Sequence, residues 1–380
     1  MNFIPVNTPL LDGNEKKYLC ECIDSGWISS EGPFVKRFEN DMAAYVGRKY
    51  GIAVCNGTAA LEAAMIALNL EKGGEVILPA FTIISCAQAI TKAGLIPVVV
   101  DCDSDTWNMD VSQIEAKITK KTKAIMVVHI YGLPVDMDPV LELARKYNLR
   151  VIEDAAEMHG QTYRGKPCGS FGDISIFSFY PNKHITCGEG GMILTDDEFL
   201  AERCRGARNL FFTAQRYRHE EIGSNFRMSN MQAALGCAQL EKLEEHIERK
   251  RIIGRKYQEA FSGIGDIKLP VPQTEYAENI YWVFGIVIGD SYDFDADQVM
   301  KRLAKEGIGT RSFFYPIHKQ PVYIKEGMFD EVSCPNAERI AERGFYLPSG
   351  LGIRDEEIDY VINKVTEIFN EWRPAMKSQA

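Results

Sequence analysis

The sequence has little that would suit it to nucleic acid or to a metal. Its formal net charge is −10 over 380 residues, and its longest basic cluster, Arg249–Arg251, stands among glutamates. A basic stripe for a phosphate backbone is missing, so we expect that cluster to be a solvated helix face. The ten cysteines include no CxxC pair and no metal-like cluster. We therefore expect reduced thiols in a cytoplasmic protein with no bound metal.

Long apolar runs and a leader-like start are also missing. No apolar stretch approaches the ~20 residues that cross a bilayer, and residues 1–11 lack a basic start followed by an apolar core. The sequence thus predicts neither membrane insertion nor secretion. With 46% hydrophobic and 25% charged residues, the composition is that of an ordinary globular protein. Because one core stops growing near about 250–300 residues, we expect two domains.

Short apolar runs bounded by turn residues recur through the first two-thirds of the chain and predict buried strands. These runs are Gly51–Cys55, Glu75–Pro79, Ile96–Asp101, Ala124–Ile130, Arg150–Asp154, Ile174–Phe179 and Gly191–Thr195. Amphipathic stretches such as Thr58–Leu68 and Pro139–Tyr147 lie between them. This alternation predicts an α/β fold with a mainly parallel, helix-covered sheet.

A long amphipathic pattern from Met231 to about Phe261 predicts one helix that carries the chain out of the first domain. Beyond it lie three patterned segments, namely strand-like Trp282–Ile288 and helix-like Asp297–Glu306 and Asp355–Trp372. Such a mixture is typical of a smaller α+β domain. We predict a large domain over residues 1–245, including an N-terminal arm, and a small domain over residues 246–380.

Three segments carry residue types that are suited to chemistry, and the first is Asn56-Gly57-Thr58-Ala59. It follows a strand and opens a helix, so the free N–H groups of the first turn and the Thr58 hydroxyl could hold a phosphate. Taken alone, a plain helix cap formed by Asn56 or Thr58 is the more frequent meaning of such a segment.

The other two segments are centred on Asp154 and Lys183. Asp154 ends an apolar strand, where ligands gather in open α/β sheets and where an anion can keep a pyridine nitrogen protonated. A helix cap explains a lone aspartate there equally well. Lys183 stands between a strand and a glycine-rich turn, where desolvation would lower its pKa and free the amine to attack an aldehyde. A solvated lysine is the commoner meaning of any single lysine.

Together and in this order, the three segments resemble the DegT/DnrJ/EryC1/StrS family of sugar aminotransferases. The resemblance covers essentially the whole chain and is nearest to the branch of GDP-perosamine synthases. It also rests on Leu11–Glu15, Gly26–Ser30, Asn182–Gly191 and the stretch from Arg311 to His318. It implies a fold-type I aminotransferase that uses pyridoxal 5′-phosphate, with a mainly parallel seven-stranded sheet and a smaller C-terminal α+β domain.

The resemblance also implies residue roles. Lys183 matches the lysine that bonds to the cofactor and carries the proton during the reaction, and Asp154 matches the partner of the pyridine nitrogen. The residues that match the phosphate site are Gly57, Thr58, Ala59, Ser178 and Asn225. The family lends the last of these to the neighbouring subunit, which implies a homodimer with shared active sites.

Two cofactor positions depart from the usual family pattern. Ile83 stands where an aromatic residue usually stacks on the cofactor ring, and it would forgo roughly 0.5–1.5 kcal/mol of stacking; Phe81 is the weaker candidate for that place. Glu157 stands where many members have glutamine near the phenolic oxygen. A like-charge contact there should raise the pKa of Glu157, and the perosamine-synthase branch tends to have glutamate at this position.

Histidines near the predicted site leave some roles open. His184 follows Lys183, and a related dehydratase branch has histidine in place of the lysine. Because the lysine is present here, we expect transamination, with His184 as a neighbour of the base. For His129 and His159, a supporting role and ordinary burial both remain open.

For the sugar nucleotide, six residues are candidates: Trp27, Ser29, Arg227, Arg311, Tyr315 and His318. An arginine fork matches the oxygen pairs of a diphosphate, although the same residues could simply link the two domains.

The reaction that the resemblance implies is transfer of an amino group from L-glutamate to C4 of a nucleotide-linked 4-keto-6-deoxy hexose. It would run as two half-reactions on one cofactor and would serve amino-sugar and surface-glycan (lipopolysaccharide O-antigen) biosynthesis. Three alternatives stay open: a dTDP- or UDP-linked sugar, a cofactor-dependent sugar dehydratase, and a binding protein that kept the fold without the chemistry.

Overall fold

A seven-stranded sheet forms the centre of the computed structural model, which describes residues 3–215 and 217–371. The strand order is β1-β9-β8-β5-β4-β2-β3. The bounds are β1 (Tyr50–Val54), β2 (Glu75–Pro79), β3 (Ile96–Val100), β4 (Thr122–Val128), β5 (Arg150–Asp154), β8 (Ile174–Ser178) and β9 (Gly191–Thr195). All neighbours pair in parallel except β9, which is antiparallel to β1 and β8. The prediction of a mainly parallel sheet is confirmed.

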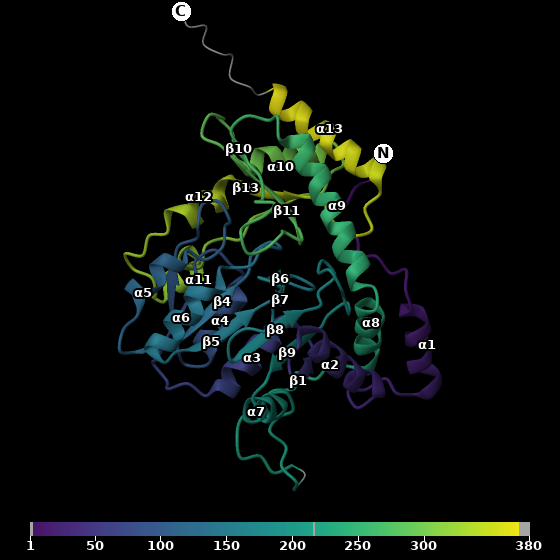
Figure 1. Ribbon diagram of the computed structural model, residues 1–380, viewed down its shortest axis with the longest axis vertical. Coiled ribbons are helices and arrows are strands. Elements are labelled where there is room, and N and C mark those ends of the chain that lie inside the picture. Colours follow the sequence, from purple (N-terminus) through teal and green to yellow (C-terminus); the bar gives the residue numbers. More distant parts are fainter. Residues whose placement is uncertain (1–2, 216, 372–380) are drawn as a thin grey trace, which may run out of the picture.

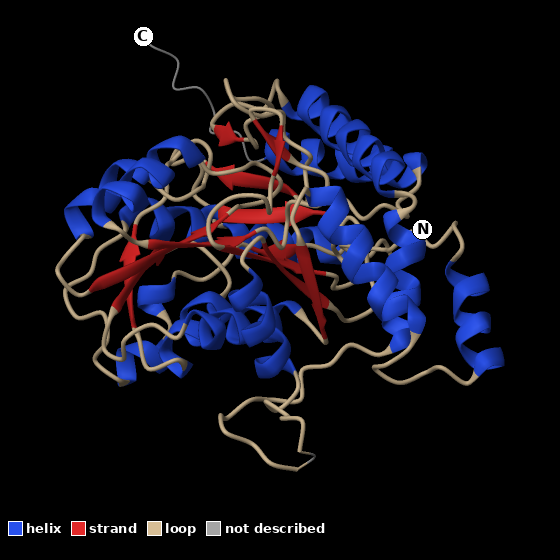
Figure 2. Cartoon of the chain, turned by 60° about the horizontal axis from the view of Figure 1, so that its bottom comes forward, coloured by secondary structure: helices blue, strands red, loops and turns tan. Residues whose placement is uncertain are grey.

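Helices cover both faces of this sheet (Figure 2). Strand side chains alternate between the two faces, so that Ile52 and Val54 join one apolar core whereas Ala53 joins the other. The first core is shared with α3 (Gly57–Leu68), α4 (Ile84–Lys92) and α7 (Glu198–Arg208). The second is shared with α1 (Glu15–Ser25), α2 (Pro33–Val46), α6 (Met137–Tyr147) and α8 (Asn230–Leu240). The sheet is therefore buried on both faces, as the continuous apolar runs predict.

The single helix predicted from Met231 to about Phe261 is wrong, because α8 ends at Leu240 and α9 (Leu243–Phe261) begins after a break. The Glu241 carboxylate at this break accepts hydrogen bonds from Tyr18, Asn14 and Arg37, at 2.6, 2.7 and 2.7 Å. These contacts tie the end of α8 to the N-terminal helices. Neither glycine nor proline stands at the break, and the apolar residues keep their helical spacing across it. The sequence pattern therefore does not reveal that the helix ends there.

A second, antiparallel sheet lies beyond α9, near the top of Figure 1. Its order is β10 (Ile267–Lys268), β11 (Phe284–Ile288), β13 (Gly344–Leu347) and β12 (Arg311–Ser312). Together with α9, α10 (Ala296–Lys305) and α13 (Asp355–Glu371), it encloses a third apolar core. The predicted helix end at Trp372 lies outside the described residues. The predicted boundary at residue 245 falls inside α9 and stays a prediction.

The remaining elements of the described chain are short: the hairpin β6 (Thr162–Tyr163) and β7 (Lys166–Pro167), the helices α5 (Ile114–Lys117), α11 (Pro321–Lys325) and α12 (Pro335–Arg343), and the 3-10 helices η1 (Val111–Gln113) and η2 (Ile317–Lys319). Within residues 3–215 and 217–371, we find no helix that is both long and apolar enough to span a bilayer.

Candidate active site

The three predicted segments lie together at the end of the large sheet where the parallel strands have their carboxyl ends. β5 and β8 are parallel neighbours that end at Asp154 and Ser178, so their carboxyl ends meet there. β1 runs in the same direction, because β9 is antiparallel to both β1 and β8, and Gly57 opens α3 soon after β1 ends. Lys183 follows β8. Topology therefore assembles residues that stand far apart in the sequence.

The N-terminus of α3 offers an anion site. The Asn56 side chain caps the helix by accepting the Ala59 N–H at 2.8 Å, so Gly57 and Thr58 supply the remaining N–H groups of the first turn. A Cβ atom added at Gly57 would lie 2.8 Å from the Ser178 Cβ, which only glycine avoids. Ser178 thus stands beside the helix start, as a phosphate donor would. The Ala59 N–H serves the cap here, and its predicted role at the phosphate stays a prediction.

Asp154 is buried at the end of β5 and is held by two donors. Its Oδ1 accepts the Ala156 N–H at 3.0 Å, and its Oδ2 accepts the Cys86 thiol at 3.2 Å. Burial raises the pKa of the Asp154 carboxyl, whereas these two donors and the positive charge of Lys183 lower it. A cation in this site would strongly stabilise the ionised form.

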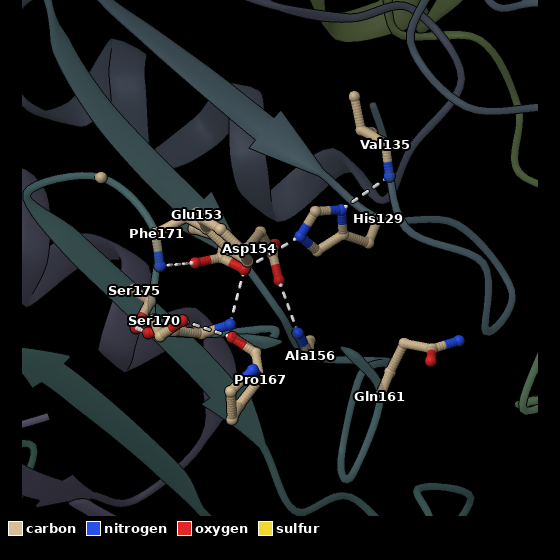
Figure 3. A network of polar contacts seen from close by, with 12 residues as sticks. His129, Val135, Glu153, Asp154, Ala156, Gln161, Pro167, Ser170, Phe171 and Ser175 are labelled. Atoms are coloured by element: carbon tan, nitrogen blue, oxygen red, sulfur yellow. Dashed lines mark hydrogen bonds and ion pairs between the residues drawn. The ribbon is translucent and has the colours of Figure 1, made fainter. Parts of the chain in front are cut away.

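The neighbouring Glu153 points to the opposite face and anchors the strand end (Figure 3). Its carboxylate lies 3.0 Å from His129 Nε2 and accepts the backbone N–H groups of Gly169 and Phe171. Since the Val135 N–H donates to Nδ1 of His129, Nε2 carries the hydrogen that reaches Glu153. His129 is therefore a satisfied buried histidine that fixes the ends of β4 and β5.

Lys183 is largely buried, with a side chain that is 10% exposed. Its Nζ lies 3.8 Å from Oε1 of Glu157 and 3.8 Å from the centroid of the Trp282 ring. Burial lowers the pKa of Lys183 below its ordinary value, against the pull of the Glu157 and Asp154 charges. The desolvated amine that the sequence predicts is present, next to Glu157 and within the electrostatic influence of Asp154.

Glu157 is a buried acid whose Oε2 accepts the Tyr131 N–H at 2.7 Å. Its pKa is raised to about 8, in the expected direction, but the chief cause is burial, with the Asp154 charge as a lesser one. Burial keeps two nearby histidines neutral, lowering the pKa of His159 to about 3 and that of His184 well below its usual range. The ring nitrogens of His159 have no partner among the described residues. The strongly lowered pKa makes His184 a weak proton acceptor, which fits a neighbour of the base better than a competing base.

The two candidates for the cofactor face differ sharply in exposure. Ile83 is 45% exposed at the N-cap of α4, whereas Phe81 is fully buried against Tyr131, Phe313 and Phe314. Phe81 is therefore committed to the core, which favours Ile83 as the side chain that a ligand would meet.

The six predicted sugar-nucleotide residues do not all meet within one chain. Arg311 lines a cavity beside the lysine segment, together with Asn7, Tyr180, Asn182, Trp282 and Tyr346. Arg227 lines a different cavity with Ser30, Arg205 and Arg208, and it donates to Asn209 at 2.6 Å. Trp27, Ser29 and Tyr315 are exposed, and Asn225 is exposed in the segment whose next residues, Phe226 and Arg227, pair with the end of β1. His318 is buried, and its Nε2 lies 2.8 Å from Glu338.

Sequence reasoning missed Trp282, Cys86 and Asn7. Trp282 meets the lysine amine, Cys86 meets Asp154, and Asn7 joins the Arg311 cavity by donating to the Pro181 carbonyl at 2.9 Å. Each comes from an element distant in sequence from its partner and carries no motif of its own, so no signal in the sequence could have found them.

Known proteins provide the deciding comparison. The sequence signature of the DegT/DnrJ/EryC1/StrS aminotransferase family matches residues 9–366. The chain belongs to this family. The predicted fold class, enzyme class and cofactor are thereby confirmed, and the protein is a pyridoxal-phosphate-dependent sugar aminotransferase of fold type I.

The chain is similar to two curated relatives and to one solved structure that illustrate this family. A GDP-perosamine synthase of Escherichia coli O157:H7 is 42% identical over 98% of this chain and 100% of its own. The GDP-perosamine synthase of Caulobacter vibrioides is 43% identical over 96% of this chain and 98% of its own. Among solved structures, S. venezuelae DesV is 34% identical, with a TM-score of 0.87 over 94% of each chain.

The described residues fit pyridoxal phosphate. The start of α3 offers N–H groups and leaves beside Ser178 a space that a Cβ at Gly57 would fill, which suits the phosphate. Asp154 offers a buried carboxyl group for the pyridine nitrogen, and Lys183 offers a desolvated amine for the aldehyde. The acid and the amine match these two groups of the cofactor in their chemistry.

Proposed function

We propose that this protein transfers the amino group of L-glutamate to C4 of a GDP-linked 4-keto-6-deoxy hexose. The observation that carries the proposal is its likeness, over almost the whole of each chain, to two GDP-perosamine synthases. The buried lysine, aspartate and helix N-terminus that the chemistry needs are all present in this chain.

Pyridoxal phosphate, when bound, supplies a ring that takes up the electron pair released as a proton leaves the carbon beside the nitrogen. Asp154 supports this chemistry by holding the ring nitrogen protonated, because its buried carboxylate gains from a cation beside it. Glu157, with a pKa of about 8, is mostly protonated at neutral pH and donates a hydrogen bond to the phenolic oxygen. Gly57, Thr58 and Ser178 hold the phosphate.

Lys183 moves the proton. With the cofactor bound, its Nζ would take the proton from the α-carbon of glutamate, and in the second half-reaction it would deliver a proton to C4 of the sugar. Burial lowers the pKa of this amine, so a larger fraction is neutral and able to accept a proton near neutral pH.

Arg311 is the candidate for an anionic group of the substrates, because it lines the cavity next to the lysine segment. Trp27, Ser29 and Tyr315 are proposed to reach the sugar nucleotide from exposed positions, and Arg227 from a half-buried one. His318 has the weakest support, since Glu338 occupies its Nε2.

We further propose a cytoplasmic homodimer in which Asn225 reaches the partner's phosphate site. Its exposed position and the exposed apolar side chains of Ile23, Trp27 and Ile28 support an interface. Light scattering on the purified protein tests this, with twice the 42.8 kDa chain mass expected and a monomer contradicting it.

The test of function is product analysis by mass spectrometry. The purified protein is incubated with L-glutamate and a GDP-, dTDP- or UDP-linked 4-keto-6-deoxy hexose. Aminated GDP-sugar with equal 2-oxoglutarate is expected, and Lys183→Ala abolishes it while the exposed Lys166→Ala does not. Amination confined to dTDP- or UDP-sugars, or a product formed without glutamate, would contradict the proposal.

A further inference from the structure

Trp282 meets the catalytic lysine segment at two points. The Lys183 Nζ lies 3.8 Å from the centroid of the indole ring, and the indole N–H donates to the Asn182 carbonyl at 2.7 Å. One contact is with the amine itself and the other is with the backbone of the preceding residue. A single side chain from the second half of the chain thus fixes both ends of the lysine.

The indole is itself held firmly. Trp282 is buried, its ring packs against Tyr131 with centroids 5.8 Å apart, and its backbone carbonyl accepts a hydrogen bond from Lys250 Nζ at 2.7 Å. Lys250 is buried too, and it also donates to the Ser349 carbonyl at 2.6 Å. Lys250 on α9 therefore ties the segment before β11 to the segment after β13 and restrains the backbone of Trp282.

An aromatic face attracts an ammonium group, and the attraction grows where water is excluded. Glu157 also lies near Nζ, at 3.8 Å, and Asp154 acts on the amine through its charge, but the raised pKa of Glu157, about 8, leaves this nearer acid mostly protonated at neutral pH. The indole face therefore supplies a persistent attraction for the protonated amine in this part of the site.

We propose that Trp282 is a positioning residue that receives the Lys183 amine whenever the lysine is not bonded to the cofactor, while its N–H fixes the Asn182 backbone. The inference rests on the proposed function, since it assigns Trp282 to the proton-carrying step. Between proton transfers the amine then stays in one place and does not sample the cavity. The indole ring also stabilises the protonated form of the Lys183 amine, whereas burial favours its neutral form.

The test measures the Lys183 amine directly. After removal of glutamate from glutamate-treated holoenzyme, amines are labelled with trace acetic anhydride across a pH series, and the Lys183 peptide is quantified by mass spectrometry. Trp282→Leu should increase the acid dissociation constant of Lys183 about threefold to tenfold, because the ring's attraction is lost. Trp282→Phe, which keeps a ring but loses the N–H donor, should change it less than threefold.

Trp107→Leu is the matched control. Trp107 is a buried tryptophan of the same aromatic cluster, packed on Tyr131 and Phe313, and no contact joins it to Lys183 within the described part of the chain. It should destabilise the core without moving the Lys183 labelling midpoint.

Should Trp282→Leu fail to fold, fluorotryptophan incorporated at all four tryptophans weakens the ring's attraction while the N–H and shape remain. It should shift the midpoint in the wild-type sequence and not in Trp282→Phe. Unchanged midpoints in both the leucine variant and the fluorinated protein would overturn the inference. Absence of a cofactor band in the same samples would instead overturn the proposed function, because the labelling shift does not depend on the cofactor.

Discussion

Gly57→Ala tests the phosphate end of the site most sharply. The added Cβ would lie 2.8 Å from the Ser178 Cβ and 3.1 Å from its Oγ, both shorter than ordinary contact distances of about 3.5–4.0 Å. Either the start of α3 or the end of β8 must shift, and both carry phosphate donors. Loss of one or two hydrogen bonds to a charged group, at about 1.5–3 kcal/mol each, predicts cofactor binding at least about tenfold weaker.

The assay is cofactor dissociation, followed by absorbance and equilibrium dialysis at several cofactor concentrations. Gly265→Ala is the control, because a Cβ added there meets nothing within 4 Å. Adding Ser178→Gly to Gly57→Ala removes the clashing atom, so the double variant should bind the cofactor better than the two single effects predict. If the losses of cofactor affinity in Gly57→Ala and Ser178→Gly were strictly additive in the double variant, or if Gly57→Ala bound the cofactor normally, the predicted clash with Ser178 would be wrong.

Two further predictions concern the other residues of the site. Glu157 has a folded pKa of about 8, above its ordinary value, so the stability it contributes is present in acid and is lost as pH rises towards 8. Thermal melts of apoprotein should show Glu157→Gln gaining stability relative to wild type as pH increases from 5 to about 8; a difference independent of pH would contradict this. Ile83→Phe should slow cofactor release about twofold to tenfold through ring stacking, whereas Ile96→Phe, at a similarly exposed isoleucine on β3, should not. Equal rates of cofactor release in wild type and Ile83→Phe would indicate that a residue other than Ile83 covers the cofactor ring.

The strands and most helices were predictable because their apolar periods are strong. Each of the seven predicted runs overlaps one strand of the large sheet, and Gly57 and Asp154 fall at element ends, where their chemistry is useful. The antiparallel direction of β9 was not visible, since a buried strand reads the same in either direction. The break between α8 and α9 was missed because side chains of the N-terminal helices, and no turn residue, stabilise it.

The residues of the candidate site also differ in whether the sequence could predict them. Lys183, Asp154 and Gly57 stand in local patterns, so sequence alone could suggest them. Trp282 approaches Lys183 only through the packing of the second sheet, and His318 is turned towards Glu338 by a helix that follows it. Such contacts depend on tertiary structure, which no local pattern records.

Lys183 is proposed to hold pyridoxal phosphate, with L-glutamate as the amino donor. The most direct test is the absorbance spectrum of the purified protein before and after L-glutamate, with Lys183→Ala beside it. We expect a band near ~410–430 nm that moves to about 330 nm with glutamate in wild type, and no such response in Lys183→Ala. A wild-type band that ignores glutamate, or an identical response in the variant, would contradict it.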